Sequence, residues 1–336
     1  MRAGIKAISY HLPEKVLTNE DIAGMFPDIR MDDLTRLTGV HKRHIAGENE
    51  TASDLAVKAA EKLFFEHKID RKDIDFLIYC STQGDFLTPP TSGILQHKLN
   101  LRKEIGNYDF NQGCTAYIYG LSQAKGLIAS GQAANVLLLT SETISKKIHP
   151  KDKSNMAIFG DGAAATLIGK TEGEGQLGEF VFGIDGSKFE TIIVRHGGAR
   201  FPLQDSKSED YKDAFGNIRN DAFFYMNGAE VFTFSAGRGP KLVEDTLRKN
   251  NLQKDDISLF ILHQANRIIL ETVFKKLSIR KDQEFYCLKE QGNTVQSTIP
   301  IALKEALNQG KLKSGDQLIL AGFGVGLSWA ATSMVV

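Results

Sequence analysis

The sequence lacks the features that mark secreted, membrane-spanning and nucleic-acid-binding proteins. It contains only three cysteines, Cys80, Cys114 and Cys287, an odd number without metal-ligand spacing, which indicates a reduced, cytoplasmic protein without a metal site. No apolar run reaches the ~18 residues of a membrane span, and the N-terminal segment has no apolar stretch typical of a signal peptide. Lysine and arginine together number 41, as do aspartate and glutamate, so the formal net charge is zero. This balance argues against a nucleic acid as the main partner.

The sequence does contain an internal repeat. Residues 65–83 and 250–266 both have a charged helix end, an Asp-Ile pair and a short apolar strand. Residues 108–142 and 285–324 both have a strand, a Gln-Gly pair, a helix that closes in glycine and a buried strand. The two matches have nearly the same offset along the chain, which indicates a duplication whose period is far too long for a solenoid.

Each copy of the repeat alternates strands and helices. Continuous apolar strands occur in the sequences FLIYC, NVLLLTS, LFILH and QLILAGF, which is typical of sheets that are covered on both faces. We therefore predict an α/β fold of two pseudo-equivalent halves, residues 1–170 and 171–336. The polar segment 195–221 is expected to lie as a loop over the second half.

The repeat also predicts where chemically active side chains lie. It aligns Cys114 and Asn293 as two helix starts, and two halves packed about a pseudo-twofold axis would bring these starts together. The free N–H groups and macrodipole of a helix N-terminus favour a thiolate, so the pKa of Cys114 is predicted to be lowered. His263 directly follows an apolar strand, where α/β sheets carry active-site side chains. A thiolate, an imidazole and an amide together can hold a thioester and stabilise charge on its oxygen.

Simpler structural roles compete with this hypothesis. A lone cysteine at a helix start is usually a core residue, and Asn293 after a glycine is also suited to be an N-cap. Cys80 and Cys287 lie in apolar segments and are expected to belong to the core. The run AGFGVGLSW approximates a phosphate-binding fingerprint, but too few residues follow it to form a βαβ unit.

A resemblance to a known family rests on six motifs, which are NQGCTAY, HQAN, GNTVQSTIP, FGDGAAA, MNGAEVF and GFGVGLSW. In content and order they resemble the β-ketoacyl-acyl-carrier-protein synthase III family over essentially the whole chain. The resemblance implies a duplicated thiolase-like fold of five layers, αβαβα, in a homodimer. It also implies an enzyme without a permanently bound cofactor, whose substrates are thioesters of coenzyme A or of an acyl carrier protein.

The same resemblance implies a role for each motif residue. Cys114 would be acylated by a thioester, and a malonyl thioester would then lose carbon dioxide and attack the acyl group in a Claisen condensation. His263 and Asn293 would bind the malonyl thioester oxygen as the enolate forms. The backbone N–H groups of Cys114 and Val325 would form the acyl oxyanion hole, and Phe323 would line the decarboxylation site.

A basic segment follows the histidine motif. It contains Arg267, Lys275 and Lys276, and a charge run of this kind is more often a solvated helix face than a binding site. The resemblance implies that this helix docks an acidic acyl carrier protein.

The sequence departs from the family at positions that contact coenzyme A and the acyl chain. Asp33 stands where the family has a tryptophan, Leu37 lies near the place of an arginine, and Lys153 replaces a second arginine. Val325 lies within the last glycine triplet, and Thr88 replaces an aromatic residue that closes the acyl pocket across the dimer. These departures predict a larger or functionalised acyl group, delivered by a carrier protein, in preference to acetyl-coenzyme A.

Other classes of protein also use cysteine, or cysteine with histidine and asparagine, in their active sites. A papain-like protease also uses cysteine, histidine and asparagine, but the sequence around Cys114 differs from that family's signature. A thiolase would have a second cysteine in the C-terminal glycine loop, and AGFGVGLS contains none. A non-catalytic subunit would typically lack Cys114. A thiolase-fold acyltransferase that passes the acyl group to an oxygen or nitrogen acceptor without decarboxylation remains the alternative.

Overall fold

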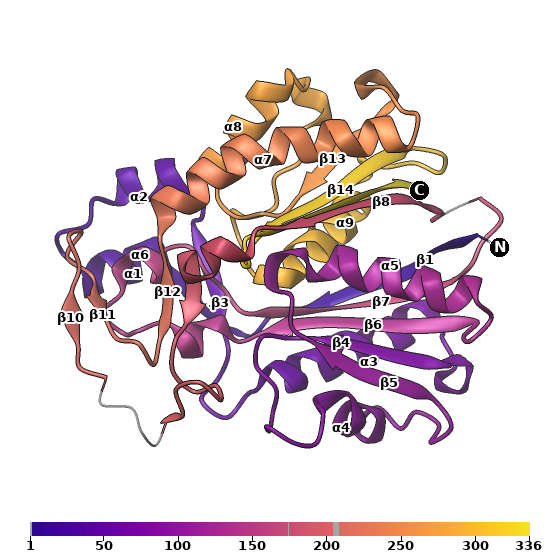
Figure 1. Cartoon of the computed structure of the whole chain (residues 1–336), viewed down its shortest axis with the longest axis horizontal. Helices are drawn as coiled ribbons and strands as arrows, with labels where there is room; N and C mark the ends of the chain where they lie inside the picture. The colour runs from indigo at the N-terminus through magenta and orange to yellow at the C-terminus, as the bar shows by residue number, and fades with distance from the viewer. Residues whose placement is uncertain (1, 174, 204–207) are drawn as a thin grey trace.

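The computed structural model describes residues 2–173, 175–203 and 208–336, and its centre is formed by two mixed β-sheets (Figure 1). The first sheet has five strands in the order β1-β7-β6-β4-β5. β4 is parallel to β5 and β6, whereas β7 is antiparallel to β6 and to β1. The strands are β1 (Ala3–His11), β4 (Phe76–Cys80), β5 (Gly106–Phe110), β6 (Asn135–Glu142) and β7 (Gly162–Lys170).

The second sheet has four strands in the order β13-β14-β15-β8. β13 and β14 are parallel, and the other two pairs are antiparallel. The strands are β8 (Leu177–Ile184), β13 (Leu259–Leu262), β14 (Gln317–Gly324) and β15 (Ser328–Val335). The boundary expected after residue 170 falls between the last strand of the first sheet and the first strand of the second. The four apolar segments singled out in the sequence form β4, β6, β13 and β14.

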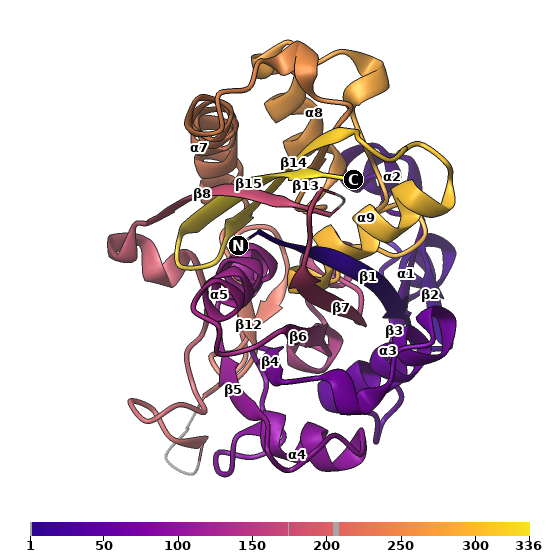
Figure 2. The same ribbon diagram turned by 90° about the vertical axis from the view of Figure 1, so that its right-hand side faces the viewer.

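Helices complete five layers (Figure 2). α5 (Ala116–Ala129) and α9 (Thr298–Asn308) lie between the sheets and contact strands of both. α3 (Ala52–His67) and α4 (Thr91–Lys98) cover the outer face of the first sheet. α7 (Gly228–Lys249) covers the outer face of the second sheet, and α8 (Arg267–Leu277) packs beside it. The predicted αβαβα layering is confirmed.

The central helix α5 is apolar around most of its surface because it has a sheet on either side. Tyr117, Ile118, Leu121 and Ile128 are completely buried in the core between the sheets. Gly120 lets the helix approach β6 closely, since a Cβ atom there would lie 2.6 Å from a side-chain carbon of Leu138. The packing of α5 on both sheets therefore holds the turn that precedes it in a defined position.

One strand expected from the repeat does not form. Residues 285–288 have no strand structure, and a single parallel bridge joins Phe260 to Glu284. The side chain of Gln264 takes the place of a neighbouring strand here. Its Oε1 accepts a hydrogen bond from the backbone N–H of Cys287 at 2.7 Å, and its Nε2 donates to the carbonyl oxygen of Phe285 at 3.4 Å.

Shorter elements surround the edges of the two sheets. β2 pairs with β3, β9 with β12 and β10 with β11. Among the described residues, no helix combines the length and apolar composition that crossing a lipid bilayer requires. The elements are β2 (Lys15–Thr18), α1 (Asn19–Met25), α2 (Met31–Thr38), β3 (Lys42–Ile45), α6 (Lys153–Met156), β9 (Ile192–Val194), β10 (Tyr211–Lys212), β11 (Ile218–Arg219) and β12 (Phe224–Met226).

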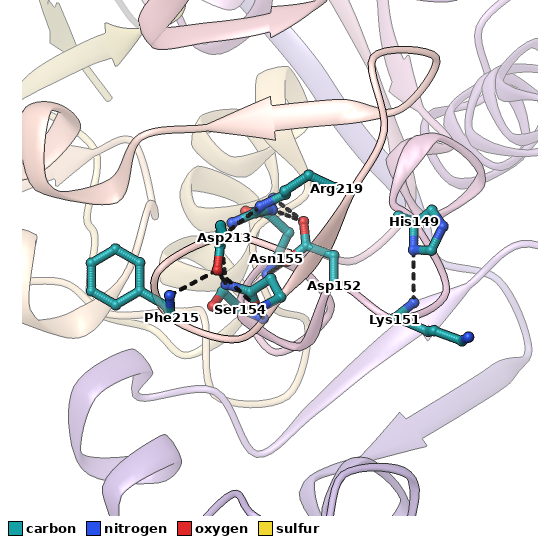
Figure 3. Close-up of polar contacts among 9 residues, drawn as sticks. His149, Lys151, Asp152, Ser154, Asn155, Asp213, Phe215 and Arg219 are labelled. Carbon is teal, nitrogen blue, oxygen red and sulfur yellow. Dashed lines mark hydrogen bonds and ion pairs between the residues drawn. The ribbon is translucent and has the colours of Figure 1, made fainter. Parts of the chain in front are cut away.

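The part of the polar segment 195–221 that forms the hairpin β10–β11 does not lie over the second half as expected, and residues 204–207 of the segment are outside the described residues. The hairpin β10–β11 lies against α6 of the first half (Figure 3). Ser154 Oγ donates to Asn217 Oδ1 at 2.9 Å, and the guanidinium of Arg219 pairs with Asp152 and, at 2.9 Å, with Asp213. Buried ion pairs that join distant segments are not visible in a hydropathy pattern.

We predict that Arg219→Met lowers the free energy of unfolding by about 3–5 kcal/mol, because it leaves the carboxylate of Asp152 buried without its cation. The Asp152 side chain is fully buried and that of Arg219 is 7% exposed. Arg248→Met is a matched control, since Arg248 is 75% exposed in its pair with Asp245. It should cost only about 0–1 kcal/mol. Equal midpoints of the two variants in urea unfolding would contradict this prediction.

Candidate active site

Cys114 lies in a 3-10 turn, η2 (Gly113–Thr115), that leads into α5. The loop after β14 passes directly over this turn. Gly113 has φ +54°, and a Cβ atom there would lie 2.1 Å from a side-chain carbon of Val325. A Cβ atom on Gly324 would lie 2.6 Å from the sulfur of Cys114. Glycine at both places is therefore what permits the two segments to approach so closely.

The protonation of Cys114 differs from the prediction. Burial raises the pKa of its thiol to about 11, although the backbone N–H groups of Val325 and of Cys114 itself hydrogen-bond the sulfur and lower the pKa. The thiol packs in an apolar cluster with Ile144, Phe159 and Val295. The predicted lowering of the pKa was wrong, because loss of water around the sulfur outweighs the backbone N–H groups.

His263 directly follows β13 and is 2% exposed. Burial lowers the pKa of its imidazole to about 3, so the ring is neutral at physiological pH. Its Nδ1 lies 2.6 Å from the hydroxyl oxygen of Thr298, which also lies 3.0 Å from the carbonyl oxygen of Val295. The hydroxyl donates to Val295, whose carbonyl oxygen also accepts the backbone N–H of Thr298, so the hydroxyl can rotate to donate its single proton to Nδ1 instead. The ring proton then resides on Nε2, where it can be donated to a ligand oxygen.

Asn293 precedes a second 3-10 turn, η8 (Val295–Ser297), and α9 begins only at Thr298. The suggestion that Asn293 is merely an N-cap is therefore wrong. Its backbone is fixed by hydrogen bonds with the carbonyl oxygen of Ile158 at 2.9 Å and the N–H of Gly160 at 3.0 Å. The side-chain Oδ1 accepts from the N–H of Val295 at 2.9 Å, and Nδ2 donates to Ala265 at 3.3 Å. The second N–H of the amide has no hydrogen bond within the described part of the chain.

These side chains meet in one cavity of about 590 Å³, although they come from segments far apart in the sequence. Cys114, His263, Asn293, Phe323 and Val325, all singled out in the sequence, line it together. The ring of Phe323 stands nearly perpendicular to that of His263, at 88°, with 6.4 Å between ring centroids.

The cavity also has lining residues that the sequence did not reveal. Thr82 and Gln83 follow β4, so the strand-end rule that selected His263 would have found them too. Lys147 and Phe224 come from short elements, a 3-10 turn and the three-residue strand β12, that no periodic pattern marks. In the described ranges, no cluster of three or more His, Cys, Asp or Glu side chains could hold a metal ion.

Comparisons with known proteins agree with this geometry. A family model described as 3-oxoacyl-[acyl-carrier-protein] synthase III matches residues 108–186, and the model of that synthase's C-terminal part matches residues 247–336. A β-ketoacyl-[acyl-carrier-protein] synthase III of Fusobacterium nucleatum is 36% identical over 330 residues, which cover 98% of this chain and 97% of the relative. The synthase III of Caldanaerobacter subterraneus is 34% identical over 98% of this chain and 96% of that relative. The chain belongs to the 3-oxoacyl-[acyl-carrier-protein] synthase III family.

Solved structures of the family share the fold closely. A crystal structure of a 3-oxoacyl-(acyl-carrier-protein) synthase III is 42% identical, has a TM-score of 0.98 and covers 100% of both chains. The five layers are therefore the duplicated thiolase-like fold of this synthase family.

The basic residues suggested for carrier docking lie on α8, outside the cavity. Arg267 is engaged by Glu271, with 2.6 Å between Nε and Oε1. Lys276 donates to the carbonyl oxygen of Ala236 at 2.9 Å, which ties α8 to α7. Lys275 is exposed and has no hydrogen bond or ion pair with the described residues. Of the three side chains, only Lys275 has its ammonium free for a partner.

The structure shows the surroundings of the residues that were expected to depart from the family's coenzyme A contacts. Asp33 pairs with Arg30 at 3.6 Å and with Arg36 at 3.3 Å. The ammonium of Lys153 pairs with Asp28, and Leu37 is 43% exposed. Asp33 and Lys153 are therefore held by partners within the chain.

We predict that alkylation of Cys114 by iodoacetamide accelerates about tenfold per pH unit between about pH 7 and pH 10, because the thiolate fraction rises until the pKa of about 11 is reached. No inflection is expected near pH 6.5, since His263 stays neutral there. Peptide mapping by mass spectrometry measures the rate, and the fully buried Cys80 serves as an internal control. A plateau below pH 8 would show instead that Cys114 is a thiolate.

Proposed function

We propose that this acyltransferase loads an acyl group on Cys114 and condenses it with a malonyl thioester to give a 3-oxoacyl thioester. The observation that carries the proposal is the single cavity that joins the sulfur of Cys114, the neutral imidazole of His263 and the amide of Asn293. A thioester carbonyl at this sulfur would face the backbone N–H groups of Cys114 and Val325 on one side. The apolar side chains of Ile144 and Phe159 would face it on the other.

In the first step, the sulfur of Cys114 attacks the carbonyl carbon of an acyl thioester. The bond to the donor's sulfur breaks, and the departing thiolate takes up the proton of the Cys114 thiol. The backbone N–H groups of Cys114 and Val325 face the sulfur, which supports their role as donors to the oxygen of the tetrahedral intermediate. The thiol needs no permanent charge in this scheme, because its proton leaves with the product.

In the second step, a malonyl thioester occupies the same cavity. Its thioester oxygen accepts hydrogen bonds from Nε2 of His263 and Nδ2 of Asn293 while the bond to the carboxylate carbon breaks and carbon dioxide leaves. The carbanion then attacks the acyl carbonyl, the bond to the sulfur of Cys114 breaks, and the thiolate is reprotonated. The apolar ring of Phe323 favours neutral carbon dioxide over the carboxylate.

We propose the following assembly and setting for the enzyme. Residues 1–170 and 171–336 are the two copies of the duplication, and two chains associate as a homodimer through the side that carries β5. Phe86 and Leu87 near this edge are 65% and 99% exposed, which supports a buried interface there. The enzyme works in the cytoplasm without a permanently bound cofactor.

The acyl donor is proposed to be larger than acetyl and bound to a carrier protein. The ion pairs of Asp33 and Lys153 support this choice, because side chains already paired within the chain are poorly suited to hold a nucleotide. Coenzyme A thioesters remain substrates of lower efficiency in this scheme.

We predict that wild-type protein, given an acyl donor and malonyl carrier protein, releases carbon dioxide and forms a 3-oxoacyl product. Cys114→Ala should form no 3-oxoacyl product, because it has no sulfur to carry the acyl group.

Mass spectrometry should find the acyl group on Cys114 alone, and hexanoyl carrier protein should acylate it faster than acetyl-coenzyme A. Acyl transfer to an oxygen or nitrogen acceptor without carbon dioxide release would favour the non-decarboxylating acyltransferase. A tenfold preference for acetyl-coenzyme A would overturn the donor assignment.

We predict that Lys275→Glu slows acylation from an acyl carrier protein about tenfold at low ionic strength, because it reverses the free charge on α8. The same acyl group on a small thioester such as N-acetylcysteamine should react at the wild-type rate. Lys72→Glu is the charge-matched control. Lys72 is exposed and lies before the N-terminal end of β4, whereas Thr82 and Gln83, which line the cavity, follow the C-terminal end of that strand. Equal slowing with both donors would mean that Lys275 acts on the fold and not on docking.

A further inference from the structure

Among the described residues that line the cavity around Cys114, Lys147 is the one lysine, arginine, aspartate or glutamate. The walls of the cavity are mostly apolar, with contributions from Ile144, Phe159 and Phe224, and no aspartate or glutamate of the described ranges lines it. A cavity with one positive charge and no negative charge has an electrostatic preference for an anionic ligand.

Lys147 is the last residue of the short turn η3 (Ile144–Lys147). Ile144, at the start of this turn, and Ile148, directly after it, are buried in the apolar cluster that contains Cys114. The side chain of Lys147 is half-buried, and its ammonium makes no hydrogen bond or ion pair with any described residue. The neighbouring Lys146 differs in both respects, because it is exposed and donates to the carbonyl oxygen of Glu48 at 2.7 Å. A half-buried lysine whose ammonium has no partner among the described residues is available to pair with an incoming anion.

Uncharged polar groups lie on the same part of the wall. Gln83 donates from Nε2 to the carbonyl oxygen of Thr143 at 3.3 Å, and it accepts from the Thr143 hydroxyl at 3.4 Å. Thr143 immediately precedes η3, so these bonds hold Gln83 beside the segment that ends in Lys147. The amide of Asn111 also lines the cavity. Together these side chains offer N–H donors with no competing carboxylate.

We infer that Lys147 binds a carboxylate at the far end of the acyl group that is loaded on Cys114, so that the preferred donor is an ω-carboxyacyl thioester, the monothioester of a dicarboxylic acid. This inference rests on the proposed function, since it names the substrate class of the same cavity. A carboxylate of this kind supplies the missing counter-charge, and a charge-assisted hydrogen bond in a partly desolvated site is stronger than one in water.

The carboxylate of the malonyl substrate is a poorer match for Lys147. That carboxylate must leave as carbon dioxide, and an ion pair would stabilise it in the ground state and oppose the step. Its proposed place beside Phe323 and His263 holds no cation, since burial keeps His263 neutral. A carboxylate that persists through the reaction is the ligand that benefits from a permanent positive charge.

The test compares donors of equal length that differ in one terminal group. Initial rates of Cys114 acylation are measured by intact-protein mass spectrometry with glutaryl- and valeryl-coenzyme A, and with adipyl- and hexanoyl-coenzyme A. The wild-type protein is expected to prefer the carboxyacyl member of at least one pair. Lys147→Met should lower the ratio of carboxyacyl to neutral efficiency by about tenfold, and Lys147→Arg should restore most of it. Lys146→Met, which removes the neighbouring exposed charge, should keep the wild-type ratio.

Three outcomes would overturn the inference in distinguishable ways. The same ratio in Lys147→Met as in the wild type would exclude a role in carboxyacyl binding while leaving the condensation intact. A loss of malonyl condensation without a change in the ratio would assign Lys147 to the malonyl carboxylate. Failure of every donor to acylate Cys114 would overturn the proposed function itself, and this inference with it.

Discussion

The close approach of the end of β14, and of the loop after it, to the turn that carries Cys114 is the constraint on which the site depends. Cβ atoms on Gly322 and Gly324 would lie 2.6 Å from the carbonyl oxygen and from the sulfur of Cys114, so only glycine fits at either place. This contact brings the N–H of Val325 to the sulfur of Cys114, which lies in the turn that precedes α5. It also sets the position of His263, whose backbone N–H donates to Ala321 of β14 at 2.8 Å. The geometry of the cavity therefore follows from the contact between the two sheets and not from any single loop.

Desolvation, and not ion pairing, sets the protonation of this site. It raises the pKa of Cys114 to about 11 and lowers that of His263 to about 3, so both side chains are neutral at physiological pH. Neutral catalytic side chains suit a reaction in which negative charge appears only transiently, because their N–H donors are preorganised before that charge forms. In such surroundings a single unpaired ammonium, that of Lys147, has more influence on ligand choice than it would have on the surface.

The element types could be predicted, and the residues that line the cavity could be singled out, because both lie in recognisable sequence patterns. The apolar runs that form β4, β6, β13 and β14 were recognisable from composition and length, and the repeat indicated a duplicated α/β fold. The fifth strand of the second sheet was predicted wrongly, because the side chain of Gln264 binds the backbone of Phe285 and Cys287 in its place. The helix-start argument for Cys114 failed for a similar reason, since it counted the nearby N–H groups but not the apolar residues that arrive from elsewhere in the chain.

The sequence by itself determined the layered α/β architecture and singled out the cysteine, histidine and asparagine that line one cavity. These depend on short-range periodicity and on motifs that can be read in order along the chain. Only the tertiary structure decided that Lys276 bonds to Ala236 while Lys275 stays free, that residues 217–219 bind α6, and that Lys147 lines the cavity. Each of these depends on which distant residues become neighbours. The charge, burial and partners of a side chain are properties of its surroundings, and the surroundings exist only once the two halves have packed together.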